Sequence, residues 1–223
     1  MAMDAPTPMP TSIGFLTLSQ WLSPAYPVGA FACSHGLEAA VDRGWVRDGE
    51  ALEHWLEDVL LHGTGRSDAL LLAAAFHAAT DQDLAEIDAT ARAFAASRER
   101  LLETEQMGAA FCAVTAAVWA ADLQGLTYPV ALGRAARSEE IPLKLTATIY
   151  LQAFLSNLIA AGQRLLPVGQ TAAQAMLRRL TPLCADVADE TNDGDLERLS
   201  GSAFLSDIAS MKHETQYSRI FRT

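Results

Sequence analysis

Two groups of side chains in this sequence have types and spacings that could support metal binding or catalysis. Cys33 and His35 lie two residues apart, and a thiolate with an imidazole suits borderline metal ions such as nickel and zinc. His54, Asp58 and His62 recur at four-residue spacing, which places them on one face of a helix. Neither group supplies a complete ligand set or matches the His-Glu-x-x-His motif. The patterns favour a structural role for the first group, a solvated surface for the second, and no resident metal.

An enzyme is the alternative function for the first of these groups. A metal-dependent hydrolase could use Cys33 and His35 together with an acid such as Glu38. Catalysis by a Cys–His pair needs a third group that orients the histidine, and the sequence indicates none. The segment Gly63-Thr64-Gly65 has neither the spacing of a P-loop nor its lysine, and no Gly-x-Ser-x-Gly motif occurs. We therefore predict a protein that is not an enzyme and holds no cofactor stably.

The composition restricts the partners and the compartment that we expect. The 223 residues carry a formal net charge of −11, which disfavours nucleic acid and anionic membranes because both bind basic surfaces. The three cysteines are odd in number and lie far apart, so a disulfide framework is not indicated. The first residues lack the basic and apolar layout of a secretory signal. We predict a cytoplasmic protein that binds neither nucleic acid nor membrane.

The elements that must position these side chains are helices. Apolar residues recur mostly at three- and four-residue spacing, with Ala and Leu dominant, which is typical of α-helices. We predict an all-α, single-domain bundle of about eight to ten helices without a sheet. Residues 1–10 are expected to be disordered, and residues 11–223 to form one domain that ends in a C-terminal tail at about 204–223. The expected helices are Ile13–Leu22, Ala30–Arg43, Asp48–His62, Ser67–Thr80, Leu84–Ala121, Tyr128–Arg137, Pro142–Leu165, Thr171–Ala188 and Ser202–Arg219, with an acidic loop at Asp186–Glu197.

One predicted helix carries a polar stripe. Thr148, Gln152 and Ser156 fall four residues apart within an uncharged, mostly apolar stretch, so they share one face of the helix. If that helix is buried on most sides, these groups are interior polar groups that neighbouring residues satisfy. The same stripe is also compatible with a wetted internal passage or with a subunit contact.

The C-terminal tail combines aromatic and basic residues. Tyr217, Ile220 and Phe221 alternate with Arg219 and Arg222, and protein interfaces are enriched in aromatic and arginine side chains. The same pattern is compatible with a last helical turn that packs on its own domain, because basic groups are favoured at a helix C-terminus. The pattern alone leaves both interpretations open.

Two segments together resemble a known protein family. The run Gln20–Glu38 and the run Met211–Arg222 look like the two signatures of urease accessory protein F, and Glu105–Gly108 and Leu165–Thr171 agree with the same family. Cys33 stands where the family often has an aromatic residue, which weakens any general ligand role for this thiol. Prolines fix φ in the first signature and glycine permits an otherwise strained turn. Its predicted site residues are Ser23, Pro24, Tyr26, Pro27, Gly29, Ser34, His35, Gly36 and Glu38.

The resemblance implies a function. Members of this family are dimeric, non-catalytic scaffolds that bridge urease accessory protein D (also called H) to the GTPase accessory protein G. They modulate GTP hydrolysis by that partner and help to deliver nickel to apo-urease, so nickel is expected only in transit. The polar stripe would give nickel a route between the partners. The residues expected to contact the D protein are Lys212, His213, Glu214, Gln216, Tyr217, Arg219, Phe221 and Arg222.

Overall fold

The computed structural model describes residues 13–223, and the regular secondary structure in that range is entirely helical. No strand occurs in that range, which confirms the predicted all-α bundle without a sheet. The prediction of disorder for residues 1–10 lies outside the described residues. The elements are α1 (Ile13–Trp21), η1 (Ala30–Ala32), α2 (Leu37–Asp42), α3 (Gly49–His62), α4 (Thr64–His77), α5 (Asp81–Ala93), α6 (Arg98–Trp119), α7 (Tyr128–Ser138), α8 (Leu143–Leu165), α9 (Gln170–Glu190), η2 (Leu196–Arg198) and α10 (Phe204–His213).

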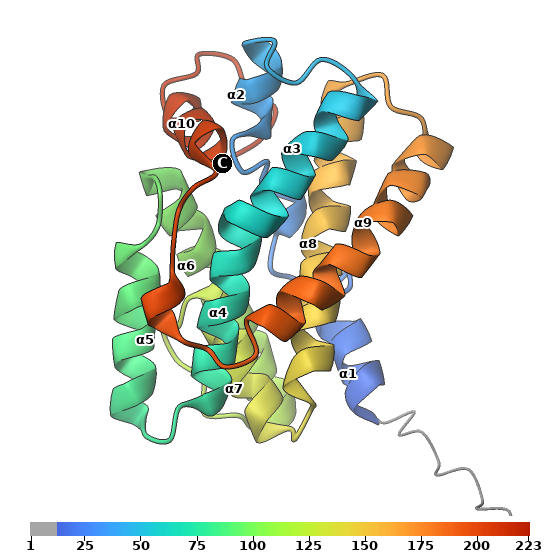
Figure 1. Ribbon diagram of the computed structural model, residues 1–223. Coiled ribbons are helices and arrows are strands. Elements are labelled where there is room, and N and C mark those ends of the chain that lie inside the picture. The colour runs from blue at the N-terminus through green and yellow to red at the C-terminus, as the bar shows by residue number, and fades with distance from the viewer. Residues whose placement is uncertain (1–12) are drawn as a thin grey trace, which may run out of the picture.

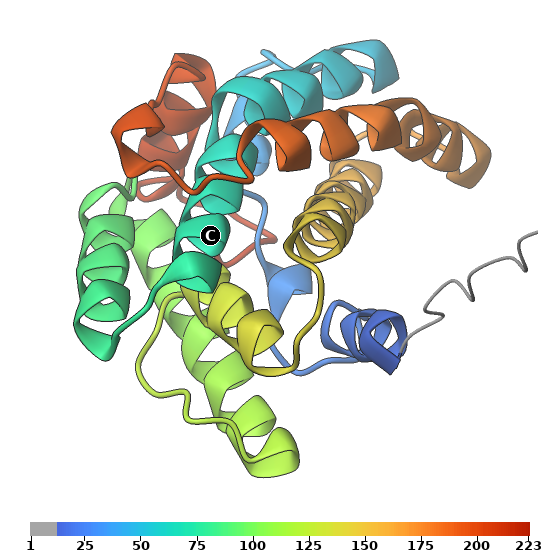
Figure 2. The same ribbon diagram turned by 60° about the horizontal axis from the view of Figure 1, so that its bottom comes forward.

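Helix α4 lies at the centre of the bundle. It packs against α3, α5, α7 and α8, and Figures 1 and 2 show it between α5 and α6 on one side and α8 and α9 on the other. Its sequence is rich in Ala and Leu, which favour helix and allow neighbours to approach closely on several sides. The contact with α7 is the tightest example, because a Cβ at Gly133 would lie 2.2 Å from the carbonyl oxygen of Leu72.

Helix α8 contradicts the interior placement of the polar stripe. Its inward face is occupied by Leu151, Phe154 and Leu155, which are buried in the core. Gln152 and Ser156 are exposed on the opposite face, and half-buried Thr148 donates its hydroxyl to the carbonyl of Lys144 within the same helix. The stripe is therefore neither a set of core polar groups nor the wall of an internal passage. The absence of charge predicts burial on most sides of this helix, whereas uncharged polar side chains such as Gln and Ser are also stable on a face exposed to water.

Helix α8 is also the only described helix that is long and apolar enough to cross a membrane. Just over half of its apolar window, 56%, is buried within the fold. Helices α9, α4, α2 and α3 pack against α8. A core helix of a globular domain has this pattern of burial.

Three predicted helices differ from the structure, two by an interruption and one by an earlier end. The helix predicted at Ala30–Arg43 is interrupted before α2, because His35 and Gly36 have φ of 53° and 79°. The helix predicted at Leu84–Ala121 is divided into α5 and α6, and the Ser97 side chain caps α6 by accepting from the Arg100 main-chain nitrogen. The last helix ends at His213, six residues before its predicted end, because the chain that follows bonds to other elements. Smaller differences place the start of α4 at Thr64 and extend α9 through Glu190, within the predicted acidic loop.

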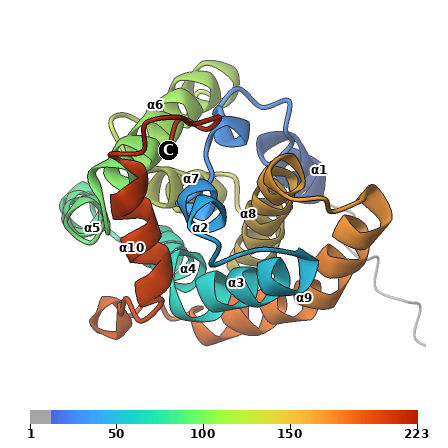
Figure 3. The same cartoon turned by 90° about the horizontal axis from the view of Figure 1, so that it is seen from above.

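Helices α2 and α10 pack together at one end of the bundle. Seen from above, α2 lies near the middle of the molecule and α10 runs beside it (Figure 3). Gly36, directly before α2, makes this approach possible, since a Cβ there would lie 2.5 Å from the main-chain nitrogen of Ser210. Two helices far apart in the sequence therefore meet at this end of the bundle.

Candidate functional site

The segment that follows α10, residues 214–223, is called the terminal segment below, and it pairs with the chain just before α2. The main-chain N–H of Ser34 donates to the carbonyl of Thr223 at 2.6 Å, and the N–H of Arg222 donates to the carbonyl of Ala32 at 2.8 Å. These bonds join two stretches that lie at opposite ends of the sequence. The structure thus brings both signature runs into one site.

Glu38 is the main anchor of the terminal segment. Its carboxylate accepts the main-chain N–H of Ile220 at 2.6 Å and that of Phe221 at 2.9 Å. The same carboxylate faces Nε2 of His213 at 3.2 Å. Glu38 is buried, and a buried carboxylate must be satisfied by donors such as these. Glu38 therefore holds the terminal segment at two consecutive peptide groups.

His213 is completely buried, which corrects the expectation that its side chain faces a partner. Its Nδ1 lies 2.6 Å from a carboxylate oxygen of Glu99, on the first turn of α6. The second oxygen of Glu99 accepts from Arg219 at 2.5 Å. The imidazole consequently lies between two carboxylates, Glu99 and Glu38. It links α10 and the terminal segment to α2 and α6.

Phe221 is the apolar anchor of the terminal segment. Its ring is 3% exposed, and the guanidinium of Arg164 lies over the ring, 4.2 Å from its centre. Arg164 also donates to the main-chain carbonyl of Phe31 at 3.2 Å. A cation over an aromatic ring is attracted by the ring electrons, so α8 and η1 both contribute to holding this end of the chain.

The predicted contact residues divide into anchors and an exposed surface. His213 and Phe221 are buried anchors, and Glu214 and Gln216 are half-buried, with Glu214 accepting from the main-chain nitrogen of Arg98. The exposed ones, together with the exposed neighbours Phe31 and Ile220, are called the tail surface below. The tail surface consists of Phe31, Lys212, Tyr217, Arg219, Ile220 and Arg222.

The tail surface combines apolar and basic groups on an acidic protein. The Tyr217 side chain is fully exposed, and Phe31 and Ile220 are 72% and 60% exposed. Exposed aromatic side chains beside arginines are the composition of protein interfaces. A complementary partner would present an apolar pocket with carboxylates at its rim.

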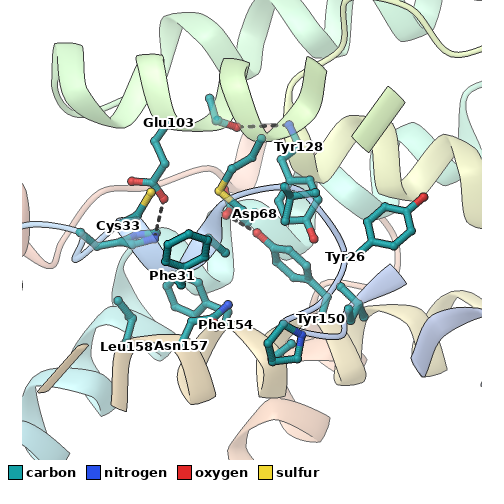
Figure 4. A pocket seen from close by; sticks show the side chains of 18 of the residues that line it. Tyr26, Phe31, Cys33, Asp68, Glu103, Tyr128, Tyr150, Phe154, Asn157 and Leu158 are labelled. Atoms are coloured by element: carbon teal, nitrogen blue, oxygen red, sulfur yellow. Dashed lines mark hydrogen bonds and ion pairs between the residues drawn. The ribbon is translucent and has the colours of Figure 1, made fainter. Parts of the chain in front are cut away.

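A small cavity lined by both apolar and charged side chains lies beneath η1 and next to this surface. Its volume is about 60 Å³, enough for a few water molecules, and Figure 4 shows the side chains around it. Glu103 lies 2.7 Å from His35 Nε2 and 2.5 Å from Arg100 Nη1, and these neighbours keep the pKa of its carboxyl low despite burial. Burial raises the pKa of Asp68 to about 6, and its carboxylate accepts the hydroxyl of Tyr150 at 2.6 Å.

The first signature forms the wall and the mouth of this cavity. The buried hydroxyl of Tyr26 bonds to Thr115 at 2.8 Å, while Pro24 and Pro27 are exposed in the turns before η1. Gly29, directly before η1, has φ of 80°, as its predicted role in a strained turn requires. Ser34 is fully buried, and its hydroxyl accepts from the main-chain nitrogen of Glu38 at 3.4 Å. The remaining signature residue, Ser23, caps the first of these turns.

The candidate metal ligands do not converge. Burial raises the pKa of Cys33 to about 12, which disfavours the thiolate that a metal or a nucleophile would need. His54, Asp58 and His62 are exposed on α3, as predicted. Within residues 13–223 no three His, Cys, Asp or Glu side chains are placed to hold a metal ion together. The hydrolase alternative therefore has no geometric support in the described part of the chain.

Several residues of the site were not predicted. Glu99, Arg100 and Glu103 lie on the first two turns of α6, Asp68 lies on α4 and Arg164 on α8. One signal was available, because Arg100 and Glu103 are spaced as ion-pair partners on one helix face. Charged pairs of that kind are usually exposed, so the sequence did not distinguish this pair from a surface pair.

Comparison with known proteins gives one consistent family. The family model described as UreF matches residues 46–181. Over 214 residues the chain is 54% identical to urease accessory protein UreF of Ruegeria pomeroyi, covering 96% of this chain and 99% of that protein. It is 60% identical over 213 residues to the protein of the same name from Ruegeria sp. (strain TM1040), covering 96% of this chain and all of that one. A third relative, from Methylorubrum populi, is 46% identical over 223 residues.

Proposed function

The chain belongs to the UreF family of urease accessory proteins, and from that premise we propose that it is a non-catalytic, cytoplasmic scaffold that joins two other accessory proteins. Membership of the family supports a role in urease maturation. In the proposed complex the chain bridges accessory protein D (H) to the GTPase accessory protein G and modulates GTP hydrolysis by G. The chain acts on apo-urease indirectly, through its contacts with these two partners.

The observation that supports this proposal is the tail surface. Tyr217, Arg219 and Arg222 of this surface project from the terminal segment, which Glu38 and Phe221 hold in one conformation. A pre-ordered segment loses less conformational entropy on binding than a flexible one. The tail surface is therefore a suitable docking site for accessory protein D.

The test is gel filtration with light scattering on the full chain mixed with proteins D and G of the same organism. Tyr217 and Arg222 are the residues to change, because both are exposed and neither side chain donates or accepts a hydrogen bond in the described structure. The double variant Tyr217→Ala, Arg222→Ala should lose the D complex while keeping its own fold. Arg178→Ala, an exposed arginine on α9, is the matched control and should assemble as the wild type does.

Two outcomes separate the alternatives. Assembly that is unchanged in the double variant would move the D interface away from the tail surface. A full-length wild-type chain that binds neither D nor G would refute the scaffold function. The same light-scattering measurement gives the mass of the chain alone and so tests the homodimer that we also propose.

Nickel in transit is the last part of the proposal. The exposed position of Gln152 and Ser156 removes the interior route that the polar stripe suggested. These two residues remain available for a subunit contact. We propose that nickel passes between the partners in the assembled complex without a stable site on this chain, and equilibrium dialysis of the isolated chain against nickel tests this.

A further inference from the structure

The cavity beneath η1 contains one charge that the described residues do not balance. Arg100 forms an ion pair with Glu103, so these two charges cancel each other. The Asp68 carboxylate accepts the Tyr150 hydroxyl through one oxygen, and it forms no ion pair within residues 13–223. A buried carboxylate without a counter-ion is unfavourable. A cation bound in the cavity would therefore stabilise this part of the wall.

The other titratable side chains of the cavity are neutral at a pH just above neutrality. Burial lowers the pKa of His35 and raises the pKa of Cys33 to about 12, so neither side chain is charged. Burial also raises the pKa of Tyr26, Tyr128 and Tyr150, so these hydroxyls keep their protons. The residues that line the cavity therefore carry one net negative charge.

Aromatic rings surround this charge. The ring centres of Tyr128 and Tyr150 lie 5.9 Å apart, and Figure 4 shows the Tyr150 hydroxyl pointing toward Asp68. The other aromatic residues that line the cavity are Trp21, Tyr26, Phe31 and Phe154. The face of an aromatic ring attracts cations, and proteins bind ammonium ligands in cages of such rings. A carboxylate among aromatic rings is thus a combination that suits an organic cation.

We propose that this cavity is a binding site for a small organic cation, a guanidinium or alkylammonium group that donates hydrogen bonds to Asp68 and lies against the rings of Tyr128 and Tyr150. The cavity volume of about 60 Å³ equals that of two water molecules at about 30 Å³ each, which suits a group of a few non-hydrogen atoms. A metal ion fits less well, since ring faces offer no lone pairs. Within the described residues no three His, Cys, Asp or Glu side chains converge on such an ion.

The cation can come from two sources with the same chemistry. The mouth of the cavity lies at η1, where the Phe31 side chain is 72% exposed and Pro24 is exposed as well. A free small molecule can enter there. Phe31 also belongs to the tail surface, so a protein docked on that surface can place the tip of a lysine or arginine side chain in the cavity. The site itself does not depend on the proposed scaffold function.

The test is a nuclear magnetic resonance titration of the full chain with guanidinium chloride, at concentrations too low to unfold it and at constant ionic strength. The pH is about 7.5, where the carboxyl of Asp68 is ionised. The reporter is the indole N–H of Trp21, which is fully buried and has no hydrogen-bond partner in the described structure. Its signal should shift and saturate. The indole signal of Trp45, which does not line the cavity, should stay constant.

Urea is the control ligand, because it has nearly the shape of guanidinium but no charge. It should give no saturating shift of the Trp21 signal over the same range of concentration. A Trp21 signal that does not respond to guanidinium, or that responds equally to urea, would overturn the proposal.

Three variants test the role of the charge. Asp68→Asn keeps the shape and removes the charge, so it should weaken guanidinium binding by about tenfold or more, as expected for hydrogen bonds to a charged group. Tyr150→Phe keeps the ring and frees a carboxylate oxygen, so it should bind at least as tightly as the wild type. Asp122→Asn, at an exposed position, is the matched control and should leave the affinity unchanged. Equal affinity in Asp68→Asn and the wild type would contradict the site.

The binding of accessory protein D distinguishes the two sources of the cation. If a basic side chain of D occupies the cavity, Asp68→Asn should lower the affinity for D by about tenfold or more, and Asp122→Asn should not. If the ligand is a free small molecule, both variants should bind D as the wild type does. If D does not bind the wild-type chain at all, the scaffold proposal fails, and the cation site is decided by the guanidinium titration alone.

Discussion

The hydroxyl of Thr223 donates a 2.9 Å hydrogen bond to the carboxylate of Glu103, a residue 120 positions earlier in the chain. Glu103 also binds Arg100 and His35 at the cavity wall. The same buried carboxylate therefore contacts the terminal segment and the cavity beneath η1. A change in the terminal segment should therefore affect the cavity, and a change in the cavity should affect the terminal segment, because Glu103 contacts both.

Glu103→Gln should be strongly destabilising at neutral pH. The amide keeps the size of the side chain but removes the carboxylate that bonds buried Arg100, and breaking a buried ion pair in this way costs about 3–5 kcal/mol. The free energy of unfolding, measured by urea denaturation, should fall by an amount in that range. Glu139→Gln, at an exposed position, should change it by less than about 0.5 kcal/mol. If Glu103→Gln lowers the free energy of unfolding by less than about 1 kcal/mol, water must solvate the Arg100 charge in place of the carboxylate.

Two glycines with nearly the same φ provide a matched comparison. Gly36 and Gly29 have φ of 79° and 80°. A Cβ at Gly36 would lie 2.5 Å from Ser210 N, whereas a Cβ at Gly29 would have no atom of another residue within 4 Å apart from its chain neighbours. Gly29→Ala should therefore cost only the backbone strain, about 1 kcal/mol. Gly36→Ala should cost about 1–3 kcal/mol more, because α2 and α10 must move apart. If thermal or urea unfolding shows the same loss of stability in both variants, α10 moves away from the added methyl group at little cost.

Asp68 should make stability depend on pH in the mildly acidic range. Burial raises the pKa of this carboxyl from 3.8 to about 6, so the folded state binds the proton more tightly than the unfolded state does. The stabilisation due to that proton is complete at low pH and is lost as the pH rises through the folded value. The Asp68→Asn side chain stays neutral and accepts the Tyr150 hydroxyl in the same way. The free energy of unfolding of this variant, relative to the wild type, should therefore increase by about 1–3 kcal/mol as the pH rises from 3.8 to above about 6. Urea denaturation at several pH values measures this difference. Asp122→Asn, at an exposed position, should show no such trend.

Much of the helical framework could be predicted because its signals are local. The predictions for α3 and α7 agree with the structure to within about one residue. Asp48 caps α3 through the Ala51 main-chain nitrogen, and Pro129 suits the first turn of α7. The break between α5 and α6 was missed because Ala95 and Ala96 are good helix formers. That break is stabilised by contacts with α10, where Ser97 bonds to Ser210 at 2.6 Å.

The site itself was predicted only in part. The two signature runs were identified as important, but nothing in the sequence indicated that they contact each other. The pattern predicts that His213 faces a partner and that the stripe of Gln152 and Ser156 is interior. Both interpretations are wrong for one reason, which is that a helical period shows which residues share a face and does not show what covers that face.

The sequence by itself determined the all-α class, most helix boundaries, the family and the residue types available at the site, because propensity, capping and motif are properties of neighbouring residues. Only the tertiary structure decided that Glu38 binds the main chain at Ile220, 182 positions away. It also decided that His213 lies between two carboxylates and that Tyr217 is left exposed. Such contacts depend on how the helices pack. The packing energy is a sum over many pairs of residues that are far apart in the sequence, and no local pattern encodes those pairs.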